Sequence, residues 1–394
     1  MRVVVSAIVI VVILALVQWF RPLPPPSVHA ALSTTYKFSG SVPALPFPTQ
    51  GQSALAVEGV GTIGATPSQT PVAIASLAKL MTAYVVLKAH PLTTGQTGPT
   101  VTVTPAQVAL YLQEKSTQSV VAVVPGERLN ELQLLEGLLI PSGNDYAQIL
   151  ADWVGGSQTN FVKMMNADAK KLGMTHTTYT DASGVSAATV STASDQLVIA
   201  EHDMKNPIFR SIVRMPQATL PVANVVYNVN YYLGHSGIIG VKTGSTAAAG
   251  GCYVAAAYRN AGATKVLVLA AVLGQQSHQS ELYAAFAAAQ KLLNSVPFLE
   301  VRQVVAAGTP GAVVTAPWLT TGVNALVPQS VSFVGWPGFT THIVFTARPL
   351  PKQVTAGTPV GTLRIVAGQQ TATVPLKTSG ALPPPSKHWR LSRL

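Results

Sequence analysis

The sequence predicts an α+β fold in which an antiparallel sheet is covered by helices, followed by a small all-β domain. Strand patterns flank a helical middle, at residues 54–63 and between 238 and 273, an arrangement typical of α+β domains. Beyond about residue 297 the chain changes to short Val- and Thr-rich runs broken by Gly and Pro, which predicts the separate β domain. Hydrophobic residues make up 48% of the 394 positions, enough for a sizeable core.

The first residues of the chain indicate export. Met1 and Arg2 precede residues 3–20, an 18-residue stretch without charge, and Arg21 follows it. This length approaches that of a membrane span and favours a retained anchor, although the Val-His-Ala of residues 28–30 is a small-x-small cleavage pattern. Either outcome predicts that the rest of the chain lies outside the cytoplasmic membrane, bound to it through the N-terminal segment or secreted.

Between residues 54 and 293 the apolar spacing changes from the period of a strand to that of a helix and back. Asn130 is a good helix cap, and Pro141 and Pro207 end the helices that precede them. The predicted elements are strand 54–63, helices 76–87, 132–140, 145–154, 161–172 and 194–204, a helix that begins at Pro105 after a short strand at 101–103, strands 238–243, 251–259 and 265–273, and helix 277–293.

The β domain is predicted from short runs of strand composition at 301–305, 312–315, 342–346, 361–366 and 371–376. The last twelve residues are basic and contain one Trp, and a solvated chain end explains them more simply than a contact with a membrane. The predicted division is a signal or anchor segment at 1–32, the helix-covered domain at 33–297, the β-rich domain at 298–382 and the basic tail at 383–394.

Ser76 and Lys79 are the first candidate catalytic residues. They form a Ser-x-x-Lys at the start of a predicted helix, where a spacing of three places both side chains on one face. A lysine whose pKa is lowered by burial can remove the proton of a serine hydroxyl and make it a nucleophile. The pattern alone is weak because it also occurs by chance.

Two further clusters follow in the chain and strengthen this interpretation. Ser142-Gly143-Asn144 lies 66 residues after Ser76, in a tight loop between two predicted helices. Lys242-Thr243-Gly244 lies 100 residues further, at the end of a strand, where a cation and a hydroxyl suit carboxylate binding and a glycine allows close backbone approach. The three clusters in this order are far less expected by accident than any one of them.

With these motifs the chain resembles the serine-type D-alanyl-D-alanine carboxypeptidases, a family of low-molecular-mass penicillin-binding proteins with a β-lactamase/transpeptidase-like fold. The resemblance spans roughly residues 54–293. It departs from the family pattern after Lys-Thr-Gly, where an aromatic residue or His and an acidic residue are often found, and at Gln275 to Gln279, where the family often has an Arg. Further stretches that match family blocks are 75–83, 139–145, 161–166, 172–174, 191–195 and 240–246.

The resemblance implies a role for each candidate residue. Ser76 would attack the bond between the two terminal D-alanines of a peptidoglycan stem peptide, with Lys79 as its base and Ser142 as a proton relay. Asn144 would hold the substrate backbone and Lys79. Lys242 and Thr243 would bind the terminal carboxylate, the feature that β-lactams mimic as covalent inhibitors. Gly244 and Ser245, which follow on the same strand, are the further candidate substrate-binding residues. The backbone N–H groups of Ser76 and Ser245 would form the oxyanion hole.

Other enzyme classes fit less well. A class A β-lactamase needs a Glu that activates the deacylating water, and no Glu-x-x-Leu-Asn stretch lies between Ser142 and Lys242. The Gly234-His235-Ser236-Gly237-Ile238 stretch fails the Gly-x-Ser-x-Gly pattern of Ser-His-Asp hydrolases at its last position. A non-catalytic, membrane-anchored binder of wall peptide or penicillin stays open as a minority alternative, because every catalytic position is filled.

The composition excludes further functions. A net charge of +11 arises from 25 Lys and Arg against 14 Asp and Glu, spread along the chain rather than in blocks, which argues against a nucleic-acid partner. No His-Glu-x-x-His motif or Cys pair occurs, so neither a metal nor another cofactor is expected.

Overall fold

The computed structural model describes residues 2–351 and 353–393, and it divides into two compact units. One unit comprises residues 42–299, and the other comprises 1–41 together with 300–394. The sequence analysis placed residues 33–41 with the helix-covered domain, whereas the contacts place them with the β-rich unit. The physical reason is strand pairing, described below for that unit.

The unit at 42–299 is built on a five-stranded antiparallel sheet in the order β11-β12-β13-β3-β4. The expected strands are present, but the 54–63 run forms a hairpin rather than one strand, with Gly59 in a left-handed conformation at its turn (φ 71°). The two faces of the sheet are covered by helices, so β12 and β13 are apolar and buried along their middle residues, 252–257 and 267–273. The strands are β3 (Gln52–Val57), β4 (Gly61–Ala65), β11 (Ile238–Thr246), β12 (Gly250–Ala261) and β13 (Thr264–Gln275).

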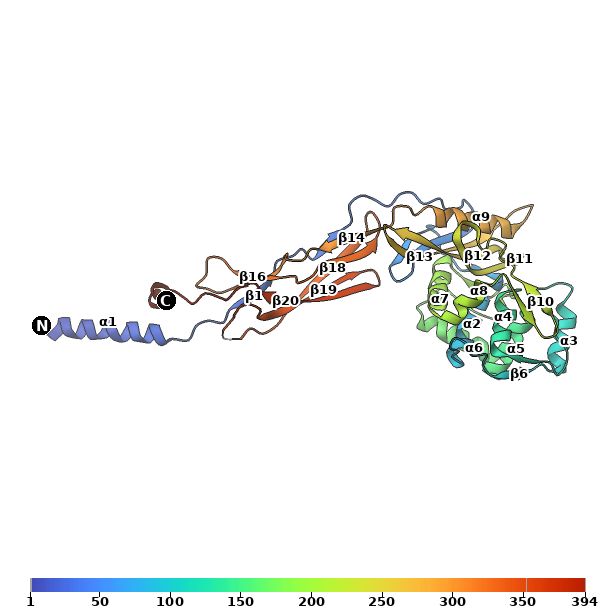
Figure 1. Ribbon diagram of the computed structural model, residues 1–394, viewed down its shortest axis with the longest axis horizontal. Coiled ribbons are helices and arrows are strands. Elements are labelled where there is room, and N and C mark those ends of the chain that lie inside the picture. The colour runs from blue at the N-terminus through green and yellow to red at the C-terminus, as the bar shows by residue number, and fades with distance from the viewer. Residues whose placement is uncertain (1, 352, 394) are drawn as a thin grey trace. The chain divides into compact units, whose positions relative to one another are not determined.

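Helices pack on both faces of this sheet (Figure 1). The helix α9 (Glu281–Asn294) lies on one face against β12 and β13, and α7 (Ala193–Lys205) lies on the other against β13 and β3. The helix α2 (Ala78–Ala89) is buried along most of its length between α7 and the remaining helices. These are α3 (Pro105–Glu114), α4 (Glu131–Leu139), α5 (Asn144–Gly155), α6 (Gln158–Lys171) and α8 (Pro207–Val213).

Helix boundaries follow the capping residues of the sequence. The Asn130 side chain accepts a hydrogen bond from Gln133 N, and the Asn130 N–H donates to the Gln133 side-chain oxygen, which completes a capping box. Pro207 does end α7, as predicted, but it also begins α8, because Asn206 caps the new helix and proline is favoured at a first helical position.

Short strand pairs and turns complete this unit. They are β5 (Val72–Ala73) with β8 (Val190–Ser191), β6 (Thr100–Thr102) with β7 (Arg128–Asn130), and β9 (Gln217–Leu220) with β10 (Asn224–Tyr227). The 3₁₀ turns are η1 (Ala75–Leu77) and η2 (His235–Gly237).

The β-rich unit contains a seven-stranded antiparallel sheet in the order β1-β15-β16-β20-β19-β18-β2. Its two edge strands, β1 (Ser27–Ala30) and β2 (Thr35–Lys37), are separated by only four residues in the chain, a span of at most about 18 Å. The sheet must therefore curl so that its edges approach each other. The other strands are β14 (Glu300–Val305), β15 (Pro310–Thr315), β16 (Val323–Leu326), β17 (Val331–Gly335), β18 (Thr340–Ala347), β19 (Pro359–Ala367) and β20 (Gln370–Thr378), of which β14 pairs with β17.

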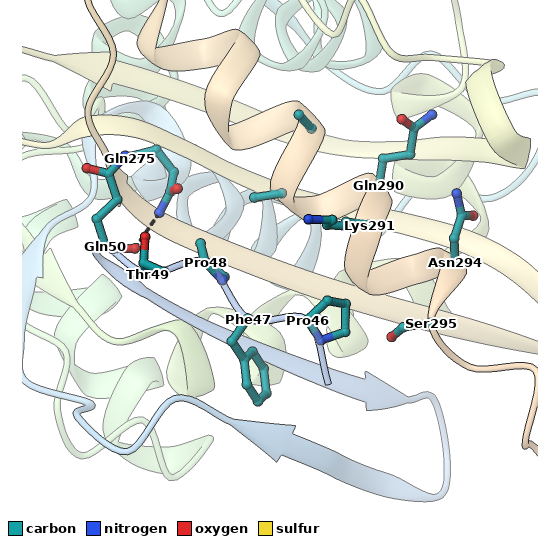
Figure 2. Close-up of a pocket in the computed structure, with 12 residues that line it drawn as sticks. Pro46, Phe47, Pro48, Thr49, Gln50, Gln275, Gln290, Lys291, Asn294 and Ser295 are labelled. Carbon is teal, nitrogen blue, oxygen red and sulfur yellow. Dashed lines mark hydrogen bonds between the residues drawn. The ribbon is translucent and has the colours of Figure 1, made fainter. Parts of the chain in front are cut away.

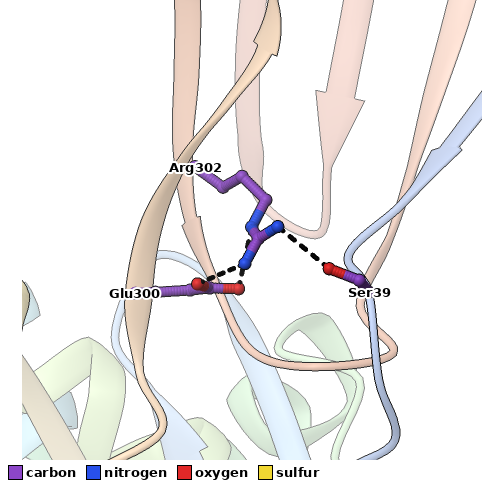
Figure 3. A network of polar contacts seen from close by, with 3 residues as sticks. All are labelled: Ser39, Glu300 and Arg302. Carbon is purple, nitrogen blue, oxygen red and sulfur yellow. Dashed lines mark hydrogen bonds and ion pairs between the residues drawn. The ribbon is translucent and has the colours of Figure 1, made fainter.

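Polar and apolar contacts also attach residues 33–41 to this unit. Figure 3 shows Arg302 between Glu300, whose two oxygens accept from it at 2.7 and 3.0 Å, and the Ser39 hydroxyl, which accepts at 2.9 Å. Phe38 is fully buried in the core of the unit and stacks edge-on against Phe339.

Helices formed by the two ends of the chain contact each other in the same unit. The helix α1 (Arg2–Phe20) ends with free backbone carbonyls, and guanidinium groups of α10 (Lys387–Ser392) and the residue after it satisfy several of them. Arg390 donates to Trp19 O at 3.0 Å, and Arg393 donates to Gln18 O at 2.8 Å. Within residues 2–351 and 353–393, no helix has both the length and the apolar character needed to cross a membrane.

We expect Phe38→Ala to destabilise only the β-rich unit, by about 3–5 kcal/mol, because it leaves a cavity in that core alone. Hydrogen exchange read separately on each unit measures this. Exchange in β18 and β19 should accelerate while exchange in α2 and β13 stays unchanged, and equal acceleration in both would contradict the division into two units.

Candidate active site

Ser76 and Lys79 lie at the start of α2, against the sheet edge. Ser76 is in the 3₁₀ turn η1, whose first residue, Ala75, has a left-handed backbone (φ 46°), and Lys79 is one turn further along. The Lys79 Nζ donates a hydrogen bond to Ser76 Oγ at 2.8 Å. The Ser-x-x-Lys spacing therefore brings the two groups together as expected.

Lys79 is completely buried, with no exposed side-chain surface. Its Nζ also lies 2.5 Å from Asn144 Oδ1, 3.4 Å from Ser142 Oγ and 3.3 Å from the Ser183 carbonyl oxygen. Burial lowers the pKa of Lys79 to about 7, against the opposing attraction of nearby carboxylates, of which Asp181 contributes most. A lysine with this pKa is substantially neutral at pH 7 and can accept a proton.

The Ser142-Gly143-Asn144 loop joins α4 to α5 and turns its two polar side chains inward. Ser142 has a left-handed backbone (φ 66°), and Gly143 N donates to the Gly137 carbonyl at 2.9 Å. Asn144 is the first residue of α5, and its amide nitrogen donates to Gln118 Oε1 at 2.8 Å. Both side chains of the motif thus reach Lys79.

Lys242 lies on β11, the edge strand of the sheet, and is also buried. Its Nζ donates to Ser142 Oγ at 2.9 Å and to the Thr243 carbonyl at 2.9 Å. Burial, and then the neighbouring charge of Lys79, hold the pKa of Lys242 well below its usual range. Ser142 therefore connects the two lysines.

Gly244 allows β11 to pass close to the turn that holds Ser76. A Cβ at this position would lie 2.9 Å from Ser76 N and 3.1 Å from the Ile74 carbonyl oxygen. The next residue, Ser245, is exposed and donates from its hydroxyl to Glu281 Oε2 at 2.9 Å, at the start of α9. Hydrogen bonds thus join Ser76, Lys79, Ser142, Asn144 and Lys242 in one cluster, and Gly244 brings β11 beside Ser76 N. The two other residues predicted for the site, Thr243 and Ser245, are their neighbours on β11.

The sequence analysis missed the loop at 181–184, which closes the site from the other side. The Asp181 carboxylate accepts from Ser183 Oγ, Gly184 N, Val185 N and Thr189 Oγ1 at 2.5–2.9 Å. This holds the Ser183 carbonyl towards Lys79. An Asp followed within three residues by Ser-Gly is a turn pattern that could have marked the loop, although not its place beside Lys79.

A groove of ≈ 850 Å³ begins next to this cluster. It is lined by Gln118, which contacts Asn144, and by Ser183, whose carbonyl contacts Lys79. Its other walls come from α3, α5, α6 and the 180–186 segment. A substrate bound at Ser76 therefore has room to extend in this direction.

A second hollow, of ≈ 600 Å³, lies apart from the cluster (Figure 2). The Pro-rich segment 46–50 forms one side and α9 the other, and Gln275 joins the segment to β13 by donating to the Gln50 carbonyl at 2.9 Å. It contains no residue of the three motifs. Among the described residues, no group of three or more His, Cys, Asp or Glu side chains could hold a metal ion.

Comparisons with known proteins agree with the motifs. The family described as D-alanyl-D-alanine carboxypeptidase matches residues 50–277. The chain is 40% identical to the D-alanyl-D-alanine carboxypeptidase DacB2 of Mycobacterium tuberculosis, over 39% of this chain and 54% of the relative. It is 35% identical to the D-alanyl-D-alanine carboxypeptidase DacC of Escherichia coli, over 46% of each. The match thus spans about half the length of these relatives.

The matches to solved structures cover a larger share of this chain than the matches to these relatives do. The Streptomyces K15 DD-transpeptidase is 29% identical with a TM-score of 0.56, and the match covers 65% of this chain and 98% of that one. Penicillin-binding protein 6B from Escherichia coli is 25% identical with a TM-score of 0.63, and the match covers 86% of this chain and 99% of that one. The predicted fold class is confirmed.

We expect Gly184→Ala to destabilise the site strongly, because a Cβ there would lie 1.8 Å from the Ala75 carbonyl oxygen, beside Ser76. Gly173→Ala is the matched control, since Gly173 has a similar left-handed backbone (φ 79° against 82°) with nothing within 4 Å. Urea unfolding should show a loss of about 1–2 kcal/mol for the control and at least about 2 kcal/mol more for Gly184→Ala. Equal losses would mean that the loop does not pack on Ala75 as described.

Proposed function

Because the chain belongs to the D-alanyl-D-alanine carboxypeptidase family, we propose that it removes the terminal D-alanine from peptidoglycan stem peptides through an acyl-enzyme on Ser76. The observation that carries the proposal is the buried Lys79, whose Nζ contacts Ser76 Oγ and whose pKa is lowered to about 7. This places a base of suitable strength beside the hydroxyl that must lose its proton in acylation.

Acylation begins when neutral Lys79 accepts the Ser76 hydroxyl proton and Ser76 Oγ attacks the carbonyl between the two D-alanines. The Asn144 side-chain oxygen and the Ser183 carbonyl both face Lys79 Nζ and stabilise the ammonium that forms. The proton is thus held on Lys79 beside the reacting bond, and the two oxygen acceptors compensate the positive charge of the buried ammonium.

The leaving amine needs that proton. Ser142 is placed to relay it, because its hydroxyl contacts both Lys79 and Lys242. A proton that moves from Lys79 to the amine through Ser142 completes bond breakage and leaves Lys79 neutral again. Water then attacks the acyl-enzyme with the same lysine as its base, and the shortened peptide is released.

Substrate binding rests on β11. Lys242 and Thr243 would bind the terminal carboxylate, which β-lactams also carry, so these drugs should acylate Ser76. The backbone N–H groups of Ser76 and Ser245 are candidates for the oxyanion hole, at about 3 kcal/mol of barrier for each donor in comparable sites. The close approach of β11 at Gly244 supports this pairing, because it brings the strand beside Ser76 N.

The substrate lies where the export signal would deliver the chain. The uncharged stretch at residues 3–20 supports a location at the outer face of the bacterial cell membrane, or secretion. Peptidoglycan is found there.

A second candidate is cleavage of cross-linked peptides by the same acyl-enzyme. It is favoured by a 33% identical relative from Escherichia coli that is named a D-alanyl-D-alanine endopeptidase. The two activities share the acyl half of the reaction and differ only in the leaving group.

We expect a fluorescent penicillin to label the full chain covalently, and Ser76→Ala to abolish the label, because this substitution removes the hydroxyl that Lys79 contacts at 2.8 Å and that forms the acyl bond. Ser211→Ala, an exposed serine of α8, is the control and should label as the wild type does. A wild-type protein that takes no label would refute the acyl-serine mechanism.

We also expect one equivalent of free D-alanine from a pentapeptide that ends in two D-alanines, and none from the tetrapeptide product. Amino-acid analysis of the reaction with time measures both. Cleavage of cross-linked dimers without any release from the pentapeptide would replace the carboxypeptidase assignment by the endopeptidase one.

A further inference from the structure

Gln118 lies outside every motif of the sequence, yet it contacts a residue of the catalytic cluster. It is in the connection that follows α3, half-buried, with its side-chain oxygen 2.8 Å from Asn144 Nδ2. Asn144 in turn places its Oδ1 2.5 Å from Lys79 Nζ. Gln118 is therefore two hydrogen bonds from the base.

The direction of the Asn144 amide matters because its two ends are chemically opposite. The oxygen accepts hydrogen bonds and the nitrogen only donates them. Lys79 Nζ is a donor, so only the oxygen is a favourable neighbour for it. An amide turned by 180° would set two donors against each other at Lys79, which has no exposed surface.

Gln118 supplies the acceptor that fixes this direction. The carbonyl of the next residue, Ser119, accepts from Asn144 N at 2.8 Å, and Val121 N donates to the Asp145 carboxylate at 3.1 and 3.2 Å. These bonds fasten the 118–121 segment to the first turn of α5. Gln118 is thus held in place by its own backbone neighbours rather than by the groove that it lines.

We propose that Gln118 is a positioning residue, which orients the Asn144 amide so that its oxygen holds Lys79 Nζ against Ser76 and Ser142. The proposal rests on the proposed function, since it concerns the rate at which Ser76 is acylated. Gln118 touches neither Ser76 nor the reacting bond and acts only through Asn144.

Two substitutions separate this role from general support of the fold. Gln118→Leu removes the acceptor, whereas Gln118→Glu keeps an acceptor oxygen at the same length and adds a negative charge. Gln113→Leu, at an exposed position of α3, is the matched control. The charged groups around Lys79 are Asp181 in its loop, Asp145 on α5, Glu114 on α3 and Lys242 on β11, and none of them is altered.

The rate of penicillin labelling of the full chain is measured against pH. We expect Gln118→Leu to lower the plateau rate by about 10-fold or more and to move the acid limb to lower pH, because the ammonium of Lys79 loses an acceptor. Gln118→Glu should restore most of the plateau and move the acid limb to higher pH, since a nearby carboxylate favours the ammonium. Gln113→Leu should match the wild type.

The proposal fails if Gln118→Leu labels at the wild-type rate, or if both Gln118 variants lose rate without any shift of the acid limb. If Gln118→Leu does not fold, as judged by circular dichroism, the pH profile of Gln118→Glu is the deciding measurement. An acid limb at the wild-type pH in that variant overturns the proposal. A wild-type chain that does not label refutes the acyl-serine function instead, so the two failures are distinguishable.

Discussion

The burial of one lysine is the constraint on which the site depends. An ammonium taken out of water is destabilised unless acceptors replace its hydration. Lys79 has no exposed surface, and the atoms around its Nζ are the Ser76 and Ser142 hydroxyls, the Asn144 oxygen and the Ser183 carbonyl. Desolvation lowers the pKa of Lys79, the charges of Asp181, Asp145 and Glu114 raise it, and the balance leaves a pKa of about 7, at which the lysine can both take and return a proton.

The fold produces this environment by bringing three separate segments around one helix. The helix α2 carries Lys79 through the middle of the unit, the α4–α5 loop and β11 approach it from other elements, and the 181–184 loop closes the remaining side. Two close approaches need glycine. Gly244 lets β11 pass beside Ser76 N, and Gly184 lets the loop pack on the Ala75 carbonyl. Ser76 is therefore held by backbone on two sides before any substrate arrives.

The sequence predicted the residues that carry local patterns and missed those that act through distant contacts. The spacing of Ser76 and Lys79 is set by helix geometry, and the cap at Asn130 is set by adjacent residues, so both could be predicted. Gln118 and Asp181 lie in irregular segments without periodicity, and only the fold brings them to the site. The pairing of β2 with β18 joins residues more than 300 positions apart and leaves no local pattern in the sequence. Composition therefore placed 33–41 with the helix-covered domain, whereas the contacts place it with the β-rich unit.

The protonation of Lys79 is the most direct test, because acylation and deacylation both begin with Lys79 in its neutral form. Lysine side chains labelled with ¹³C and ¹⁵N can be titrated by NMR in the full chain, with Lys79→Arg to assign the resonance. The Lys79 signal should change from ammonium to amine near pH 7. A signal that stays that of an ammonium up to about pH 9 or beyond, as for an ordinary lysine, would contradict the role of Lys79 as the base.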